Sequence, residues 1–436
     1  MPKGPRGPIE KPKDRKKVLL RLWTYIYAHK WMALAAVLLT VSSNLLALLG
    51  PMLSGEAIDA IGMEPGQADF PTVFFFCGLM IVFYAVSSLL SYILSILMIQ
   101  LSQRIVFQMR QQVFDRLTQL PVRYFDGTQT GDIVSRISYD IDTVNASLSN
   151  DLLQIAASVI TVVGSFIMMV VISPTLVLVF VITIPMSILF TRYMTKKVRP
   201  LFHQRSVKLG EMNGFVEEII TGQKTTKAYH QEETMISRFD QRNKAAVDAY
   251  YNADYYGGMT GPSVNFINNL SLAFVSIFGA ILFLWGHLSI GNLSSFVLYS
   301  RRFSGPINEA ANILSELQSA CAAAERVFRL IDEEPEPADA PNAVSIDQVE
   351  GEVAMDHVRF GYDPGKTIIH NLSFTAPKGS LTAIVGPTGA GKTTLINLLM
   401  RFYDPDSGAI TLDGRNIQQI TRKSLRLSYA MVLQDT

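Results

Sequence analysis

Cysteine, charged residues and short catalytic motifs are all scarce in this 436-residue chain. The two cysteines, Cys77 and Cys321, lie far apart and have no metal-ligand spacing, so the sequence excludes a disulfide scaffold and favours two packing residues. The six histidines form no HExxH pattern and no GxSxG occurs, which removes two common signatures of hydrolases. Charged residues make up only 17% of the chain, against about 25% in a soluble globular domain.

The apolar content points to a membrane. Residues of apolar type make up 49% of the chain, and its mean hydropathy is +0.24. Those values exclude a disordered or collagen-like chain. The charged fraction is nevertheless too high for a chain made only of membrane helices. We therefore expect a membrane part followed by a soluble part.

The N-terminus is basic. Residues 1–30 contain nine Lys and Arg but only two acids, Glu10 and Asp14. Such an arm binds nucleic acid or an anionic membrane surface, and the apolar stretch that follows favours the membrane. Residues 15–29 mix basic side chains with Leu, Trp, Ile and Tyr, which predicts an interfacial helix. The alternative is an ordinary solvated leader.

Six segments have the length and composition of membrane spans, each of about 20 mostly apolar residues. The first is too long for the apolar region of a cleavable signal peptide, and no small-residue cleavage site follows it. The six predicted spans are 31–53, 72–101, 147–172, 174–194, 262–285 and 292–318.

The distribution of Lys and Arg predicts the orientation of these spans. Segment 102–146 holds five of these residues and segment 195–258 holds ten, whereas loop 54–71 holds none. We therefore expect a multi-pass protein of the cell membrane, with its N-terminus, both long connecting segments and its C-terminal part in the cytoplasm.

The two long cytoplasmic segments have few helix breakers. They are too long for structureless loops in a compact domain. Residues 195–220 would form a helix that reaches roughly 40 Å from the membrane. Turn signals at Asp126-Gly127 and at residues 221–225 predict a short turn at the tip of each pair of stalks.

Polar residues within spans suggest a substrate cavity. In the fifth span Asn265, Asn268 and Asn269 fall on one helix face. In the sixth, charged and amide side chains follow an aromatic one. The alternative is pairing between helices or a solvated wall. The candidate cavity residues are Asn265, Asn269, Tyr299, Arg301, Arg302 and Asn308.

A linker and a change of pattern separate the membrane part from a soluble domain. Residues 332–345 hold three prolines and five acids, which is typical of a linker. Short β-type runs follow at Val353–Phe360, Leu372–Thr375 and Leu381–Val385. The expected divisions are a basic arm and interfacial helix (1–30), a six-helix domain (31–330), a linker (331–345) and the soluble domain (346–436).

A glycine-rich loop follows the last β-type run and matches GxxxxGK[ST]. Backbone N–H groups of such a loop surround phosphate oxygens, the lysine contacts the β- and γ-phosphates, and the next hydroxyl binds Mg²⁺. A helix would begin there and present its N-terminus to the anion. The loop residues are Gly386, Pro387, Thr388, Gly389, Ala390, Gly391, Lys392, Thr393 and Thr394.

With these motifs the chain resembles an ATP-binding cassette (ABC) exporter half of type I. The resemblance covers residues 15–436 and implies a six-helix membrane domain with the N-terminal part of an α/β P-loop nucleotide-binding domain. It implies ATP and Mg²⁺ as cofactors. Residues 358–362 resemble the adenine-stacking loop, which makes Tyr362 the candidate ring. Residues 432–435 match the Q-loop, with Gln434 as an Mg²⁺ contact beside Thr393.

The resemblance extends to the stalk tips and implies the partners. Phe125-Asp126 with Arg136 resembles the first coupling loop, and residues 217–233 resemble the second. The chain is most similar to one subunit of bacterial heterodimeric multidrug exporters, which favours a heterodimer over a homodimer. The implied substrate is an amphipathic drug, lipid or peptide, and nucleic acid is not an expected partner.

The resemblance breaks off two residues after Gln434, at Thr436. The family's signature loop, Walker B aspartate, adjacent glutamate and switch histidine do not occur in this sequence. Phosphoryl transfer needs an oriented nucleophile, so we expect these residues alone to bind ATP without hydrolysing it. A nucleotide-binding domain cut from a longer chain is the favoured explanation. The alternatives are a non-transporting remnant or ATP-gated regulator and, remotely, a soluble P-loop kinase.

Overall fold

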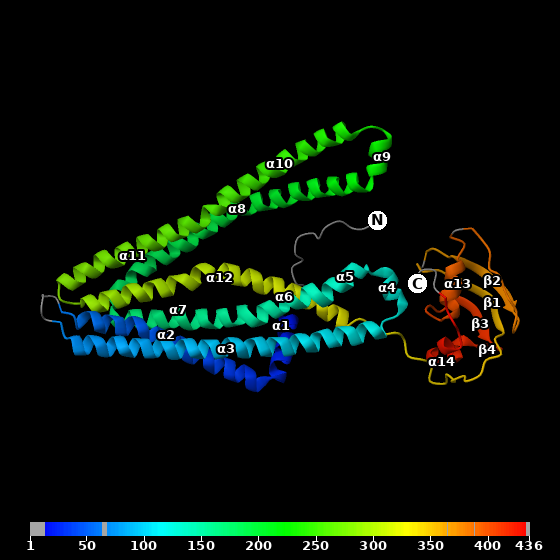
Figure 1. Ribbon diagram of the computed structural model, residues 1–436, viewed down its shortest axis with the longest axis horizontal. Helices are drawn as coiled ribbons and strands as arrows, with labels where there is room; N and C mark the ends of the chain where they lie inside the picture. The colour runs from blue at the N-terminus through cyan, green and yellow to red at the C-terminus, as the bar shows by residue number, and fades with distance from the viewer. Residues whose placement is uncertain (1–13, 63–67, 364, 388, 433–436) are drawn as a thin grey trace. The chain divides into compact units, whose positions relative to one another are not determined.

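The fold consists of two compact units, each described here by itself. One is built from residues 1–106 and 142–325, and the other from residues 107–141 and 326–436. The computed structural model describes residues 14–62, 68–363, 365–387 and 389–432 (Figure 1).

The first unit is entirely helical in its described residues. Two long helices, α3 and α12, run beyond it into the second unit. The elements in chain order are α1 (Arg15–Ala28), α2 (Lys30–Asp59), α3 (Phe70–Gln119), α6 (Ile141–Ala146), the π-helix η2 (Ser147–Asp151), α7 (Leu152–Ile172), α8 (Pro174–Thr221), α9 (Gln223–Ala228), α10 (Glu232–Gly258), α11 (Thr260–Leu284) and α12 (Ile290–Ile331).

Five predicted spans are confirmed as helical segments long and apolar enough to cross a membrane. These segments cover Lys30–Asp59, Phe70–Gln119, Thr130–Ile172, Pro174–Thr221 and Glu232–Leu284. The sixth predicted span lies in the 42-residue helix α12, which is not among the five. Charged residues such as Arg301, Arg302 and Glu309 lower the hydropathy of α12.

Helix α1 has the two-sided character expected of an interfacial helix. The Asp14 side chain caps its N-terminus by accepting a hydrogen bond from the Lys17 N–H at 3.2 Å. Val18 and Leu22 are buried, one turn apart, whereas Trp23 and Tyr27 are about 60% exposed. The helix therefore combines a packed side with exposed aromatic side chains, a pattern typical of membrane-surface helices.

Local sequence explains where the longest helices begin and how they pack. Ser173 caps α8 through its Oγ, which accepts from the Leu176 N–H, and Pro174 occupies the first helical turn. Helix α8 packs along α10 and α11, and α2 packs against α7 (Figure 1). The predicted turn at residues 221–225 is confirmed at Gly222, between α8 and the short α9.

The second unit combines a helical tip with a small sheet. The sheet has the order β2-β1-β3-β4, and its neighbouring strands are antiparallel. Its elements are α4 (Val122–Gly127), α5 (Thr130–Ser135), the π-helix η1 (Arg136–Asp140), β1 (Val353–Phe360), β2 (Ile369–Ala376), α13 (Lys392–Leu399), β3 (Ser407–Leu412), β4 (Arg415–Asn416), the 3-10 helix η3 (Ile417–Gln419) and α14 (Arg422–Leu427).

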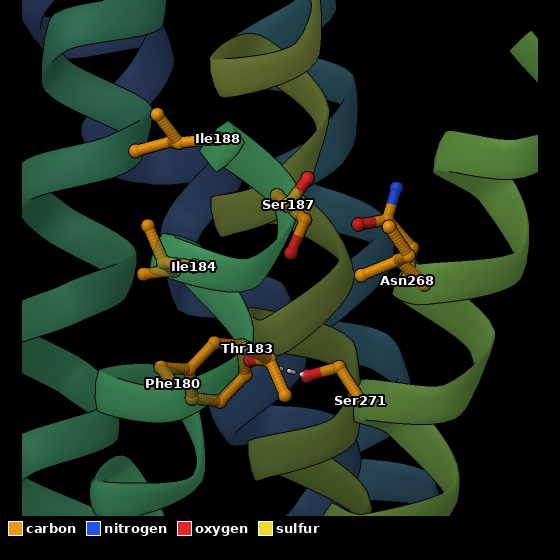
Figure 2. A pocket seen from close by; sticks show the side chains of 9 residues that line it. Phe180, Thr183, Ile184, Ser187, Ile188, Asn268 and Ser271 are labelled. Carbon is orange, nitrogen blue, oxygen red and sulfur yellow. Dashed lines mark hydrogen bonds between the residues drawn. The ribbon is translucent and has the colours of Figure 1, made fainter. Parts of the chain in front are cut away.

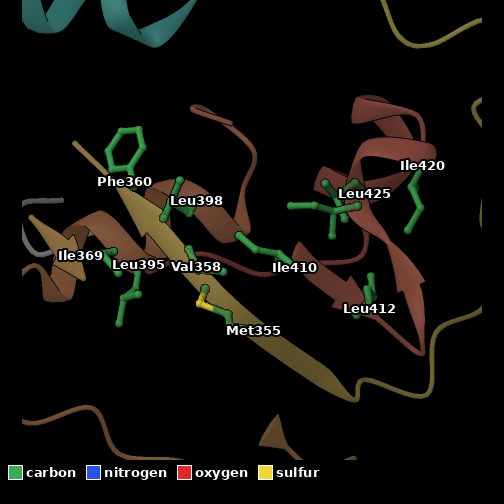
Figure 3. Close-up of a cluster of buried hydrophobic side chains, with 11 residues drawn as sticks. Met355, Val358, Phe360, Ile369, Leu395, Leu398, Ile410, Leu412, Ile420 and Leu425 are labelled. Atoms are coloured by element: carbon green, nitrogen blue, oxygen red, sulfur yellow. The ribbon is translucent and has the colours of Figure 1, made fainter. Parts of the chain in front are cut away.

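The core of this unit forms between the sheet, α13 and α14 (Figure 3). Along β1, Met355, Val358 and Phe360 are buried, and a register shift between Met355 and Val358 brings both onto the core side. Leu395 and Leu398 come from one face of α13, and Leu425 comes from α14. This packing fixes the start of α13 against the sheet, which holds the glycine-rich loop in place.

One predicted strand is not present. Residues 381–385 have no strand pairing, and Leu381 is fully exposed. An apolar strand in the middle of a sheet needs backbone partners on both sides, and the described residues supply none for this segment. The β-type runs at Val353–Phe360 and Leu372–Thr375 are confirmed, as β1 and part of β2.

Ion pairs connect the predicted linker to α14 of the second unit. Arg426 binds the Glu336 carboxylate with both terminal nitrogens, at 3.0 and 2.5 Å. Arg422 donates to Asp339 at 3.0 Å and to the Pro337 carbonyl at 2.8 Å. The acidic linker residues are therefore fastened to α14 within this unit.

An ion pair and a hydrogen bond also stabilise the helical tip of the second unit, which consists of α4, α5 and η1. The guanidinium of Arg326 binds both oxygens of Asp140, at 2.9 and 2.7 Å, and Asp140 is only 2% exposed. Arg136 donates to the Tyr124 hydroxyl at 3.0 Å. These bonds hold α4 and α5 as a defined turn, as the sequence predicted at Asp126-Gly127.

Candidate functional site

The glycine-rich loop has the geometry of an anion cradle. Gly389 and Gly391 both have a φ of +87°, a left-handed conformation that glycine adopts without strain. A Cβ at Gly391 would lie 3.1 Å from a methyl group of Ile368. Helix α13 starts at the next residue, so its first N–H groups have no acceptor within the helix and point toward the loop.

Lys392 folds back over this loop. Its Nζ donates to the carbonyls of Gly386 and Pro387, at 2.7 and 2.9 Å. The Ala390 N–H also bonds to the Pro387 carbonyl, which closes the turn. The ammonium group therefore lies within the loop, where it would meet a bound phosphate as a positive point charge.

The two threonines at the start of α13 differ in their surroundings. Thr394 is buried and its Oγ1 lies 3.3 Å from the Tyr362 hydroxyl, whereas Thr393 is exposed. Of the two hydroxyls, that of Thr393 is open to a metal ion at the mouth of the loop. This arrangement fits an Mg²⁺ ion held beside a phosphate group.

Tyr362 lies beside the phosphate loop. Besides Thr394, Asn397 of α13 contacts its hydroxyl, donating at 3.0 Å. The rings of Phe360 and Tyr403 pack edge-on against Tyr362, each with centroids 5.0 Å away. The structure thus brings Tyr362, predicted as the adenine-stacking ring, together with the helix that begins at Lys392.

Tyr403 connects this aromatic cluster to the helical tip. Its hydroxyl donates to Oδ2 of Asp126 in α4 at 2.5 Å. Burial, followed by the Asp126 carboxylate, raises the pKa of Tyr403 well above its ordinary value, so the phenol stays a donor into the alkaline range. A continuous contact therefore runs from Asp126 through Tyr403 to Tyr362.

Two predicted nucleotide contacts lie outside the described residues. They are Thr388 in the glycine-rich loop and Gln434, the second predicted Mg²⁺ contact. The remaining loop residues, from Gly386 to Thr394, are all placed around one turn and the first turn of α13.

In the helical unit, a small polar pocket lies between α8, α11 and α12 (Figure 2). Thr183 and Ser271 lie 3.1 Å apart through their hydroxyl oxygens, and Asn268, Ser187 and Ser304 also line the pocket. Its volume of about 30 Å³ is enough for a water molecule but not for a substrate.

The predicted cavity residues of α11 separate into two groups. Asn265 and Asn269 are exposed on the helix surface. Asn268, on the same predicted face, lines the small pocket instead. Of these three asparagines, Asn268 lines the small pocket, whereas Asn265 and Asn269 do not.

Two predicted cavity residues of α12 pair with α2. The hydroxyl of Tyr299, a fully buried residue, donates to the Leu48 carbonyl at 2.6 Å. Arg302 donates to the Ala47 carbonyl, also at 2.6 Å. Pairing between helices, the alternative considered above, describes these two side chains.

Pro51 explains the contact that Arg302 makes. A proline has no N–H, so the carbonyl four residues earlier, that of Ala47, loses its helical donor. The Arg302 guanidinium supplies the missing donor from the neighbouring helix. Of the remaining predicted residues, Arg301 is exposed, and the side chain of Asn308 lies outside the described residues.

Contacts continue between the C-terminal end of α2 and the N-terminal end of α12. Ser295 donates to the Pro51 carbonyl at 2.7 Å. Asp59 accepts from the Gly291 N–H at 2.7 Å and from Ser289 at 2.5 Å, which caps the start of α12. These contacts were not predicted from the sequence; the signals that could have pointed to them are the acid Asp59 after the first span and the proline Pro51 within it.

Comparison with known proteins gives matches over both parts of the chain. The family model of the ABC transporter transmembrane region matches residues 33–307, and the ABC transporter model matches residues 369–436. The first match alone covers more than half of the chain.

Three relatives show the range of similar proteins. The ABC transporter ATP-binding protein YfiC of Bacillus subtilis is 38% identical over 98% of this chain and 70% of its own length. A fatty acid ABC transporter ATP-binding/permease protein of Mycobacterium tuberculosis is 38% identical over 87% of this chain, which spans 60% of that relative's length. An ATP-dependent lipid A-core flippase of Vibrio vulnificus is 30% identical over 95% of this chain and 70% of its own length.

Proposed function

Because the chain belongs to the ABC transporter family, among its exporters, we propose that it is half of a pump that uses ATP to move an amphipathic substrate out of the cytoplasm. The observation that supports this most is the contact from Tyr362 through Tyr403 to Asp126. It offers a path by which nucleotide at the loop acts on the helical tip that follows α3.

ATP would bind at the glycine-rich loop. Lys392 would contact its β- and γ-phosphates, the start of α13 would face the anion, and Tyr362 would stack on adenine. Thr393 and Gln434 would hold Mg²⁺, which neutralises charge on the phosphates when bound.

The pump would need a second ABC half. Two ATP molecules would lie between the two nucleotide-binding domains, and closure of these domains would turn the substrate cavity from inward to outward facing. We favour a heterodimer. The sixth span would be part of α12, and the Lys and Arg distribution supports a cytoplasmic N-terminus and nucleotide-binding domain.

The relatives support an amphipathic substrate. Relatives are named as a fatty acid transporter, a lipid A-core flippase and a putative multidrug exporter. We therefore propose a drug, a lipid or a peptide with both polar and apolar parts.

The test is Lys392→Ala in the whole protein, assayed in inverted membrane vesicles with a fluorescent amphiphilic dye. ATP-driven uptake should be lost while membrane insertion stays intact. Lys378→Ala is the matched control, because Lys378 pairs with Glu350 on the surface of the same unit. Normal uptake by Lys392→Ala would contradict the proposed function.

A further inference from the structure

We propose that the helical unit holds a two-part site for one membrane amphiphile, with an apolar cavity for its acyl chain and an adjoining neutral groove for an uncharged headgroup. The inference rests on the proposed export function, because it names the class of substrate. Both parts of the site lie among α1, α2, α3, η2 and α7, all within one unit.

The apolar cavity has a volume of about 270 Å³. A dry apolar cavity of about 150 Å³ in another protein is large enough to hold benzene, so this one has room for a segment of alkyl chain. Its walls expose almost only carbon. They include Trp23, Ile26, Met98, Leu101, Leu148 and Leu152.

The neutral groove has a volume of about 440 Å³ and a different chemistry. Hydroxyl and amide side chains from three helical segments face it. They include Ser43, Asn44, Ser91, Ser95, Asn150 and Gln154. Several of these groups already bond within the helices, as Ser43 and Asn44 do to the Thr40 carbonyl and Ser95 does to the Ser91 carbonyl. Their hydroxyl and amide oxygens can still accept hydrogen bonds, which a polyhydroxylated headgroup would donate.

The two parts meet. Thr40 and Leu153 line both the cavity and the groove. The π-helix η2 serves both as well, because Leu148 lines the cavity while Ser149 and Asn150 line the groove. Single π-turns inside α-helices are frequent at functional sites. The two parts therefore adjoin, and the proposed amphiphile would place its apolar end in the cavity and its polar end in the groove.

The charges at and near the groove determine which kind of headgroup it fits. None of the described residues that line the groove is charged. The nearest ion in the hydrogen-bond network is a carboxylate, since Glu309 of α12 accepts from the Gln154 amide at 3.0 Å. An anionic headgroup would be repelled by this negative charge. The groove therefore fits a neutral headgroup better than a free carboxylate.

The position of the groove along the helices suits transport of a headgroup. Thr40 lies ten residues into α2, which places it roughly 15 Å along the helix. The apolar cavity extends back from there to Trp23 of the interfacial helix α1. A headgroup in the groove would thus already be drawn into the depth of the span, while its chain stays near the membrane surface.

Photolabelling tests the site directly. The whole protein, in lipid nanodiscs without nucleotide, is irradiated with a monoacylglycerol that bears a diazirine in its acyl chain, and the labelled peptides are sequenced. We expect labels on the residues of η2, α7 and α1 that line the cavity. Unlabelled monoacylglycerol should compete, and a fatty acid of the same chain length should compete weakly.

Two substitutions of alanine by phenylalanine, one inside the site and one outside it, provide the matched pair. Ala156→Phe fills the cavity, since Ala156 lines it, and should abolish the labelling. Ala85→Phe places the same ring on an exposed position of α3 outside the site and should leave labelling unchanged. Equal labelling in both variants, or labels spread evenly along the lipid-facing helices, would overturn the proposal.

A charge change tests the headgroup. Asn150→Asp places a carboxylate in the groove and should strengthen binding of a cationic alkylamine by about tenfold relative to monoacylglycerol, as a charged hydrogen bond replaces a neutral one. Asn292→Asp, at an exposed position at the start of α12, makes the same change away from the groove. An equal shift in the two variants would contradict the assigned headgroup site.

Failure of this site and failure of the pump can be told apart. Labelling of the cavity without any ATP-driven uptake in vesicles would support the site and contradict the export function. ATP-driven uptake of a fatty acid, with no labelling of the cavity, would leave export intact and overturn the site.

Discussion

Arg302 acts, in our account, as a replacement for the helical donor that Pro51 removes. Its guanidinium nitrogen lies 2.6 Å from the Ala47 oxygen. A hydrogen bond from a charged donor contributes about 1.5–3 kcal/mol in soluble proteins, whereas those measured within membrane bundles average about 0.6 kcal/mol. We therefore expect Arg302→Met to lower the free energy of unfolding by about 1–2 kcal/mol.

The same substitution should cost much less when Pro51 is replaced first. Pro51→Ala restores a backbone N–H, which can bond to the Ala47 carbonyl within α2. In that background the guanidinium is no longer the donor this carbonyl depends on, and the loss should fall to about 0.5 kcal/mol or less. Arg301→Met is the control, because Arg301 is exposed next to Arg302 on the same helix.

The assay is reversible unfolding of the purified protein in mixed detergent micelles, followed by circular dichroism. The four variants of the cycle (wild type, each single variant and the double variant) are compared at one detergent composition. If Arg302→Met lowers the free energy of unfolding equally with Pro51 and with Pro51→Ala, Arg302 does not replace the donor that is missing at Pro51.

Three further predictions concern the second unit, which contains the glycine-rich loop. Tyr403→Phe removes the hydroxyl that binds Asp126, so transport per ATP hydrolysed should fall while binding of fluorescent ATP stays near wild type; an unchanged ratio would contradict the path. Gly391→Ala forces a side chain into a left-handed conformation at a cost of about 1–2 kcal/mol, and ATP affinity and melting temperature should both drop. Burial raises the pKa of Tyr429 to about 12, so its stabilising effect is complete below about pH 10 and is lost between about pH 10 and 12. Tyr429→Phe should remove that part of the alkaline loss in an unfolding titration.

The parts of the fold predicted from sequence are those governed by local pattern. Apolar runs predicted five confirmed spans, because length and hydropathy alone decide whether a helix can cross a membrane. The glycine-rich loop was placed before a helix because its spacing demands one, and α13 begins at Lys392 as expected. The turn at Gly222 followed from breaker residues.

The parts that could not be predicted depend on contacts between distant segments. Tyr299 and Arg302 looked like cavity residues because polarity within a span signals function, yet their partners are carbonyls of α2. No sequence pattern reveals that contact without knowing which helices are neighbours. The bond between Asp126 and Tyr403 joins residues far apart in the chain, and only folding brings them together.

The prediction of a strand at Leu381–Val385 was wrong for a related reason. Its composition is that of a buried strand, but a strand forms only where neighbours accept its backbone hydrogen bonds. The π-helix η2, which places Leu148 and Asn150 on the two parts of the proposed site, has no recognisable sequence signal.

The most direct test of the central claim is accumulation against a gradient. Inverted vesicles that contain the whole protein and its partner half would be given ATP and a fluorescent monoacylglycerol, and the ratio of inside to outside concentration would be measured. We expect a ratio above one with ATP, and a ratio of one without ATP or with Lys392→Ala. Equal concentrations on both sides in the presence of ATP would mean that the protein gates a passive path, and would contradict the account.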